Sequence, residues 1–232
     1  MRADGGEPRL LRGAVRAWPA VGRWSAEWLA GAHPDWEVPV GATARGQLAL
    51  DRRLTLRMQR QPLPEALAAG YVMAPLDELP PALRAAVAEP ALVRGARWRS
   101  GKLWISARDT VTPLHFDVAH NFHALVSGRK RFRLYRRADW CALYPQPPWS
   151  GLPNFSRVDP ERVDGAFPRF ARARPLLFTL EPGDALVIPG GVWHHVTSEL
   201  DSVSVNFWWA RGLHARLAAG TDALKRWRGL VR

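Results

Sequence analysis

Short runs of apolar or alternating residues recur between Gly95 and Ala210, and glycine or proline separates one run from the next. Gly128 and the triplet Pro182-Gly183-Asp184 are the clearest turn signals. Several short strands joined by such turns are typical of an all-β sandwich or barrel. We therefore expect a mainly β core, with strands in the segments 103–106, 122–126, 131–135, 185–189 and 202–208.

The residues before this core predict a mixture of helices and strands. Ser25 is placed as the N-cap of a short helix that ends before His33 and Pro34. Pro64 and Pro81 each stand near the start of a further helix, where the missing N–H of proline costs nothing. Alternation in two later segments predicts short strands at 47–50 and 53–57.

The end of the chain is helical in composition, and no internal repeat or long linker divides the sequence. With 232 residues, of which 47% are hydrophobic, the chain can bury one sizeable core, and all-β domains of this size are often undivided. We therefore expect a single domain over residues 1–232. Its parts are an N-terminal α/β lead-in (1–95), the β core (96–210) and a C-terminal helix (211–232).

The sequence also carries an expectation about location. It has no run of about 18 apolar residues that would cross a membrane, and its first residues lack the apolar stretch of a secretory signal. Cys141 is the only cysteine, so no disulfide framework can form. We expect a cytoplasmic protein that does not enter a membrane.

The net charge of +12 is carried mostly by arginine, since only three of the 33 basic residues are lysine. Such a charge favours encounters with anionic partners, including acidic peptides, nucleic acid and phospholipid. The arginines are dispersed rather than gathered in one block, and codon bias in a GC-rich genome explains them equally well. The charge therefore leaves the partner open.

The strongest chemical signal is the segment Thr110-Val-Thr-Pro-Leu-His-Phe-Asp. His115 and Asp117 are two residues apart, so on a strand their side chains share a face and can converge on one ion. Far downstream, the triplet Trp193-His194-His195 offers another nitrogen ligand. Two histidines and one carboxylate on one face, with other coordination positions open, suit a non-haem Fe(II) oxygenase.

These motifs resemble the JmjC, or cupin-like, family of oxygenases that depend on Fe(II) and 2-oxoglutarate, and within it the asparaginyl hydroxylases that act on hypoxia-inducible factor. The resemblance spans about residues 98–210 and includes 111–117, Gly128-Arg-Lys-Arg-Phe-Arg-Leu-Tyr, 182–198 and Ser204-Val-Asn-Phe-Trp-Trp. It implies a double-stranded β-helix (jelly-roll) core with flanking N- and C-terminal helices.

The resemblance also implies roles for single residues. His115, Asp117 and His194 match the metal ligands, so the first histidine of the Trp-His-His triplet is the ligand. Lys130 and Thr112 match the residues that hold the distal carboxylate of 2-oxoglutarate. A buried anion needs such a cation because an unpaired buried charge is very costly. The remaining matches near the co-substrate and metal are Asn121, Asn206 and Trp208.

Two features lie outside the shared pattern. His123 shares the inward face of its strand with Asn121, at a position where relatives tend to carry an apolar or aromatic group. We interpret it as a core histidine with satisfied hydrogen bonds, with contact to substrate or a proton relay as the alternatives. The segment 139–174, rich in proline, tryptophan and arginine, resembles the substrate-facing variable region of the family, and such loops often carry specificity.

The resemblance implies hydroxylation of a peptide or protein side chain, with Fe(II), 2-oxoglutarate and dioxygen. A lysine demethylase, a hydroxylase of tRNA or a small metabolite, and a metal-binding cupin without redox activity stay open as alternatives. A basic groove continuous with the pocket would favour RNA, whereas Thr112 and Lys130 argue against a mere binding module. Relatives often dimerise through C-terminal helices, so residues 213–232 are either a homodimer interface or a solvated cap.

Overall fold

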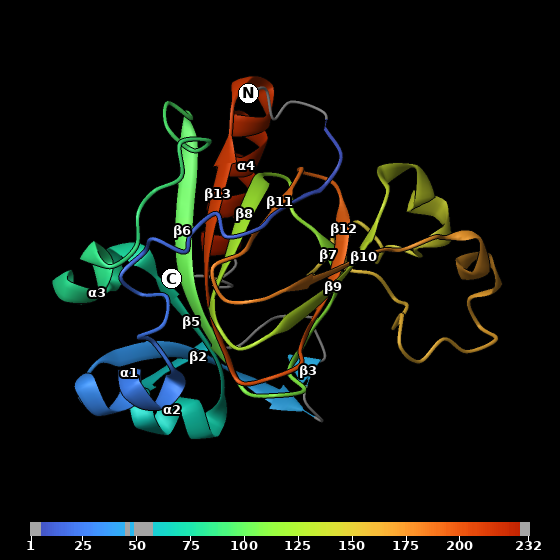
Figure 1. The fold of residues 1–232 in the computed structure, drawn as a ribbon. Coiled ribbons are helices and arrows are strands. Elements are labelled where there is room, and N and C mark those ends of the chain that lie inside the picture. The colour runs from blue at the N-terminus through green and yellow to red at the C-terminus, as the bar shows by residue number, and fades with distance from the viewer. Residues whose placement is uncertain (1–5, 45–46, 49–57, 228–232) are drawn as a thin grey trace.

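The computed structural model describes residues 6–44, 47–48 and 58–227. Its strands form two sheets, antiparallel except where β3 lies parallel to β7 (Figure 1). The major sheet has the order β1 (Arg9–Leu11), β11 (Ala185–Ile188), β8 (His120–Ser127), β13 (Ser202–Ala210), β6 (Trp98–Ser106), β5 (Gly70–Pro75), β2 (Glu37–Ala44), with β4 (Met58–Pro62) also on β2. The minor sheet has the order β7 (Val111–Phe116), β12 (Trp193–Ser198), β9 (Lys130–Tyr135), β10 (Leu176–Leu180), and β3 (Gln47–Leu48) pairs with both β2 and β7.

The core strands pass back and forth between the two sheets. From β6 to β9 each strand enters the sheet opposite to its predecessor, and β11, β12 and β13 repeat the alternation. This is the winding of a jelly roll. The prediction of a mainly β, jelly-roll core is confirmed, and each of the five strand segments expected from the sequence lies within or largely overlaps an observed strand.

Alternation along β8 separates two packing environments. Phe122, Ala124 and Val126 face a large apolar cluster shared with the N-terminal helices. Leu125 and its partners in the minor sheet, Phe132 and Leu134, form the apolar layer between the sheets. Because side chains alternate across a strand, Asn121 and His123 share the inner face with Leu125. The inner layer is thus apolar at one end and polar at the other.

The helices of the lead-in begin where the sequence predicts. The Ser25 hydroxyl accepts a hydrogen bond from the Trp28 N–H at 3.0 Å and caps α1 (Ala26–Ala32), which ends at His33. Pro64 lies in the first turn of α2 (Leu63–Ala69), and Pro81 opens α3 (Pro81–Ala85). Three short 3-10 helices are η1 (Leu76–Glu78), η2 (Arg137–Ala142) and η3 (Pro168–Arg172).

The strands of the lead-in extend the major sheet. Residues 47–48 of the expected strand 47–50 form β3, and the strand expected at 53–57 lies outside the described residues. β5 pairs with β6 along Val72–Pro75. Segments from the first third of the chain therefore lie directly beside the core strands, and Tyr71 and Met73 reach the same pocket as the core residues.

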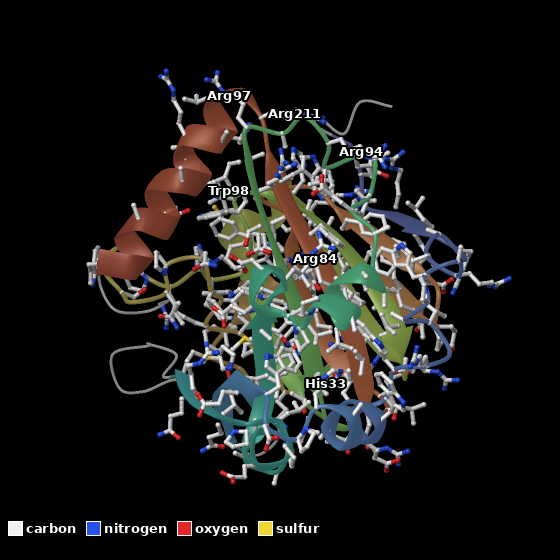
Figure 2. The ribbon with its side chains drawn as sticks, turned by 90° about the vertical axis from the view of Figure 1, so that its left-hand side faces the viewer. His33, Arg84, Arg94, Arg97, Trp98 and Arg211 are labelled. Atoms are coloured by element: carbon white, nitrogen blue, oxygen red, sulfur yellow. The ribbon has the colours of Figure 1, made fainter. Side chains whose placement is uncertain are left out.

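The C-terminal helix α4 (Gly212–Trp227) packs on one end of the major sheet. Ala215 and Ala218 are buried against Ala210 and Trp98. Just before the helix, the Arg211 guanidinium donates hydrogen bonds to the backbone carbonyls of Leu92 and Arg94, and Figure 2 shows Arg94, Trp98 and Arg211 at this end of the molecule. Among the described helices, none combines the length and apolar character that a membrane crossing requires.

Candidate metal and co-substrate site

Two neighbouring strands of the minor sheet bring the three expected ligands together. His115 on β7 lies opposite His194 on β12 in the strand register, and their ring centroids are 4.1 Å apart. Asp117 follows the end of β7, with its Oδ2 3.8 Å from His194 Nε2. One ligand atom from each residue lies within 4.8 Å of the others. The two segments are 77 residues apart in sequence, and the pairing of β7 with β12 brings them together.

A bulge in β7 adds Thr112 to the same face. His115 pairs with His194 and Thr112 pairs with Val196, so two residues of β7 oppose one residue of β12 between these pairs. On a regular strand, residues three apart face opposite sides, whereas a bulge brings them to one side. Pro113 lies in the bulge, where a residue without an N–H is tolerated.

Backbone carbonyls orient both histidines. His115 Nδ1 lies 2.8 Å from the Pro113 carbonyl oxygen, and His194 Nδ1 lies 3.1 Å from that of Val192. A carbonyl can only accept, so each Nδ1 carries the proton and each Nε2 keeps its lone pair. Such hydrogen bonds are the usual means of fixing a metal-binding imidazole.

Trp208 orients the carboxylate ligand. Its indole Nε1–H donates a hydrogen bond of 2.8 Å to Asp117 Oδ2. Trp208 lies on β13 of the major sheet, so this bond crosses from one sheet to the other. The same Oδ2 lies 3.8 Å from His194 Nε2, so the bond from Trp208 holds the carboxylate beside the histidine ligand.

His195, the other histidine of the triplet, faces away from the site. It belongs to the opposite face of β12, where Arg133 is its register partner on β9. Its ring is only 1% exposed, and burial lowers its pKa to about 4. The structure therefore brings His194, and not His195, to the other ligands.

Lys130 is a buried cation without a hydrogen-bonding partner in the part of the chain that the structure describes. Its exposure is 0%, and its Nζ makes no hydrogen bond. The ammonium lies 5.6 Å from the centre of the Tyr71 ring. Burial lowers the pKa of Lys130 to about 7. An orphaned buried ammonium is costly, and a bound carboxylate would remove the cost.

Tyr71 belongs to this site, although sequence reasoning did not single it out. Its hydroxyl hydrogen-bonds the Thr112 side chain, and burial raises its pKa to about 12, so it remains a neutral donor. Tyr71 stands in the lead-in, whose sequence pattern predicts only short helices and strands. Its role depends on the pairing of β5 with β6, which no local motif signals.

The two asparagines close the polar end of the inner layer. Asn206 Nδ2 donates to Asn121 Oδ1 at 2.9 Å, and both residues are 3% exposed. Asn206 Oδ1 has no hydrogen-bond partner among the described residues. With Thr112 and Trp208 they line one pocket together with the three candidate ligands. Lys130 is not part of that lining, but its neighbours Tyr71 and His123 are.

The interpretation of His123 as a histidine with satisfied hydrogen bonds does not agree with the structure. The residue is 5% exposed and lines the pocket, yet its Nε2 has no hydrogen-bond partner within the described chain. Its ring packs edge-on against Phe132, with 4.9 Å between the ring centroids. The two alternatives, contact with substrate and a proton relay, remain.

The pocket has a volume of about 930 Å³ and an aromatic outer part. The segment 145–155 supplies much of this part, and α4 contributes Ala218 and Thr221. Trp140 and Trp149 lie on the same side and are 43% and 84% exposed. The expected substrate-facing segment 139–174 therefore does border the pocket.

Contacts with β7 hold this segment beside the metal ligands. The Phe155 ring stacks on His115 with 5.0 Å between centroids. Phe116 N–H donates to the Asn154 carbonyl, and the Asn154 side-chain amide donates back to the Phe116 carbonyl at 2.9 Å. A change in this segment would therefore directly affect β7, the strand that carries His115.

The residues present fit a divalent metal and a small dicarboxylate. Two imidazoles and one carboxylate form the donor set of a facial Fe(II) site. The carboxylate of the dicarboxylate that does not bind the metal needs a cation and hydroxyl groups away from the three metal ligands. Lys130 supplies the cation, and Tyr71 and Thr112 supply the hydroxyls. An iron centre here would leave positions open towards the pocket.

Comparisons with known proteins agree with this chemistry. Residues 3–214 match the cupin-like domain family. The chain is 30% identical over 222 residues to Jumonji C domain-containing protein 5 of Drosophila melanogaster, covering 89% of this chain and 55% of that protein. It is 32% identical over 214 residues to lysine-specific demethylase 8 of Xenopus tropicalis (88% and 48%) and 31% identical over 217 residues to lysine-specific demethylase JMJ30 of Arabidopsis thaliana (88% and 50%). The chain spans about half the length of these curated relatives.

Proposed function

The chain belongs to the cupin-like, JmjC-type family of Fe(II)- and 2-oxoglutarate-dependent oxygenases, and from this premise we propose that it hydroxylates a side chain of a peptide or protein. The observation that carries the proposal is the presence, in one site, of a His-Asp-His group and of the buried Lys130, whose Nζ has no hydrogen-bond partner among the described residues. A protein that only bound a metal would gain nothing from an ammonium buried without a partner.

His115, Asp117 and His194 would hold the iron, and Lys130, Tyr71 and Thr112 would hold the distal carboxylate of 2-oxoglutarate. Bound iron supplies the activation of dioxygen, of which one atom enters a substrate C–H bond and the other enters succinate as 2-oxoglutarate loses CO₂. The protein contributes orientation and a dry environment. Trp208 fixes the Asp117 carboxylate, and Phe155 shields one face of His115.

The wall of the pocket favours a peptide over a nucleic acid. Aromatic and proline side chains dominate the segment 145–155, and such surfaces are typical of peptide and protein contacts. Of the described residues that line the pocket, Lys102 is the only lysine or arginine. RNA would require a basic groove continuous with the pocket, and the described lining does not provide one.

Turnover of 2-oxoglutarate to succinate with Fe(II) and ascorbate tests the proposal. Wild type is expected to form succinate slowly alone and faster with a peptide substrate, and His115→Ala is expected to form none. Peptide libraries incubated with the enzyme would then reveal a product that has gained one oxygen atom. Metal-loaded wild type that neither binds nor consumes 2-oxoglutarate would refute the oxygenase proposal.

Demethylation of lysine is the second candidate, because two of the relatives are named lysine-specific demethylases. Hydroxylation of an N-methyl group uses the same centre and ends in release of formaldehyde. The two functions differ in their products: a demethylase removes the methyl group of a methyl-lysine peptide, whereas a hydroxylase leaves a stable product with one more oxygen. Mass spectrometry and a formaldehyde assay on the same reaction separate them.

A further inference from the structure

His123 is a polar residue at a position that the apolar layer between the sheets would otherwise fill. It lies on β8, opposite Asn206 on β13 and Leu186 on β11. Its exposure is 5%, and its Nε2 lacks a hydrogen-bond partner within the described residues. Leaving a buried polar atom unpaired costs on the order of 1–3 kcal/mol. A bound molecule that pairs with Nε2 would remove this cost.

His123 lies at the Lys130 end of the site, because its ring packs against Phe132, which shares a face of β9 with Lys130. Burial lowers the pKa of its ring well below the usual range, and the charge of Lys130 lowers it further. The imidazole is therefore neutral and carries a single N–H. The distance of 4.9 Å between the ring centroids of His123 and Phe132 supports this placement.

We propose that His123 is a co-substrate-binding residue whose Nε2–H donates a hydrogen bond to the distal carboxylate of 2-oxoglutarate. A molecule that reaches from Lys130 to the metal ligands must pass along the pocket wall to which His123 belongs. A neutral donor adds to the ammonium of Lys130 without adding a second positive charge to a buried place. The inference rests on the proposed oxygenase function and deepens it.

The hydrogen bond is expected to strengthen co-substrate binding by about 10-fold to 100-fold, as is typical of a bond to a charged group. His123→Leu removes the donor and supplies an apolar side chain suited to the layer between the sheets. His123→Gln keeps an N–H donor at similar length and is the matched control. Both variants keep the metal ligands and Lys130.

Isothermal titration of 2-oxoglutarate into Mn(II)-loaded protein measures the effect without turnover. The Kd of wild type is expected to rise at least about 10-fold in His123→Leu and only about 3-fold in His123→Gln. The Kd for Mn(II) alone should be equal in all three proteins. Thermal unfolding of each metal-loaded protein confirms that the variants are folded.

Pyruvate, which has the 2-oxo acid but no distal carboxylate, identifies the end that His123 contacts. Wild type and His123→Leu are expected to bind pyruvate equally. Equal 2-oxoglutarate affinity in wild type and His123→Leu overturns the proposal. The proposal also fails if His123→Leu loses as much affinity for pyruvate as for 2-oxoglutarate, because the contact would then lie at the metal end. If wild type itself fails to bind 2-oxoglutarate, the oxygenase proposal fails instead.

Discussion

At the scale of single residues, the site is set by which polar groups have partners inside the protein and which do not. Trp208 Nε1 and the two histidine Nδ1 atoms are engaged by hydrogen bonds that orient the metal ligands. Lys130 Nζ and His123 Nε2 have no such partners in the described chain. The first group orients the metal ligands in the absence of a metal, and the second group can donate hydrogen bonds to a bound anion.

Trp208→Phe should weaken metal binding while keeping an aromatic wall. The change removes the hydrogen bond to Asp117 Oδ2, so the carboxylate loses its fixed orientation. Loss of such an outer partner typically weakens metal affinity by about 10-fold to 100-fold. Competition with a chelator of known affinity measures the Kd for Mn(II). An unchanged Kd would mean that Trp208 serves only packing.

Lys130→Met should stabilise the protein without co-substrate and abolish 2-oxoglutarate binding. The folded-state pKa of Lys130 is about 7, below its value of 10.5 in an exposed lysine. Between these two pH values the unfolded chain therefore binds more protons than the folded chain. The destabilisation of the fold by the buried Lys130 is complete below pH 7 and fades as pH rises to 10.5. We expect a gain of roughly 2–4 kcal/mol in the free energy of unfolding at pH 7, measured in urea. Lys102→Met, which removes a cation that lies 5.9 Å from the Trp104 ring, is the control and should keep 2-oxoglutarate binding.

Binding of 2-oxoglutarate should take up protons at alkaline pH. With a pKa of about 7 in the empty site, Lys130 is mostly neutral at pH 8, and a dicarboxylate stabilises its charged form. Affinity should therefore fall as pH rises above 7. Titrations at pH 8 in two buffers with different ionisation enthalpies should reveal uptake of roughly one proton. No uptake in wild type would place the anion elsewhere than at Lys130.

At the scale of elements, the β7 bulge and the turn that carries the chain from β8 in the major sheet to β9 in the minor sheet position the site. The bulge turns Thr112 to the side of His115. This turn sets where β9 begins, and therefore which face of the minor sheet Lys130 occupies. Gly128 forms this turn with a φ of 82°, a conformation that a residue with a Cβ adopts only under strain.

Gly128→Ala should destabilise the protein more than Gly22→Ala. A Cβ at Gly128 would lie 2.7 Å from the Cβ of Ser202 and closer still to the Asp201 carbonyl, whereas one at Gly22 meets nothing within 4 Å. Both glycines have similar positive φ, so their difference isolates the clash. We expect a loss of roughly 2–4 kcal/mol for Gly128→Ala and about 1 kcal/mol for Gly22→Ala in urea unfolding. Equal losses in the free energy of unfolding for the two variants would mean that the positive φ alone, and not the clash, causes the destabilisation.

At the scale of the whole molecule, the site joins the two sheets. The minor sheet supplies His115, His194 and Lys130, and the major sheet supplies Asn206 and Trp208. A co-substrate held by both sheets resists their separation. Its binding energy is then added to the stability of the folded chain.

Mn(II) and 2-oxoglutarate together should stabilise the protein beyond Mn(II) alone. At about 100 times its Kd, 2-oxoglutarate is expected to add roughly 2.7 kcal/mol. Differential scanning fluorimetry measures the rise in Tm, and removal of the metal with a chelator should reverse most of it. In Lys130→Met, Mn(II) should still raise Tm but 2-oxoglutarate should add nothing. A full 2-oxoglutarate increment in this variant would contradict the site described here.

Local patterns in the sequence determine the class of fold and the chemical character of the site. Strand period, turn glycines and the Ser25 cap are short-range signals, because each depends on neighbouring residues and backbone geometry. The His115–Asp117 spacing is of the same kind. These signals predict a mainly β core and a metal-binding strand end, and the motifs around them indicate the family.

Only the tertiary structure decides which distant residues meet. Tyr71 joins the site because β5 pairs with β6, and His194 because β12 pairs with β7. The β7 bulge, which turns Thr112 inwards, is set by cross-strand register and not by the local pattern. Likewise, the lack of a hydrogen-bond partner for His123 Nε2 among the described residues follows from what surrounds the ring in space. Pairing between remote strands depends on burial and hydrogen bonding summed over the whole chain, and therefore no local motif records it.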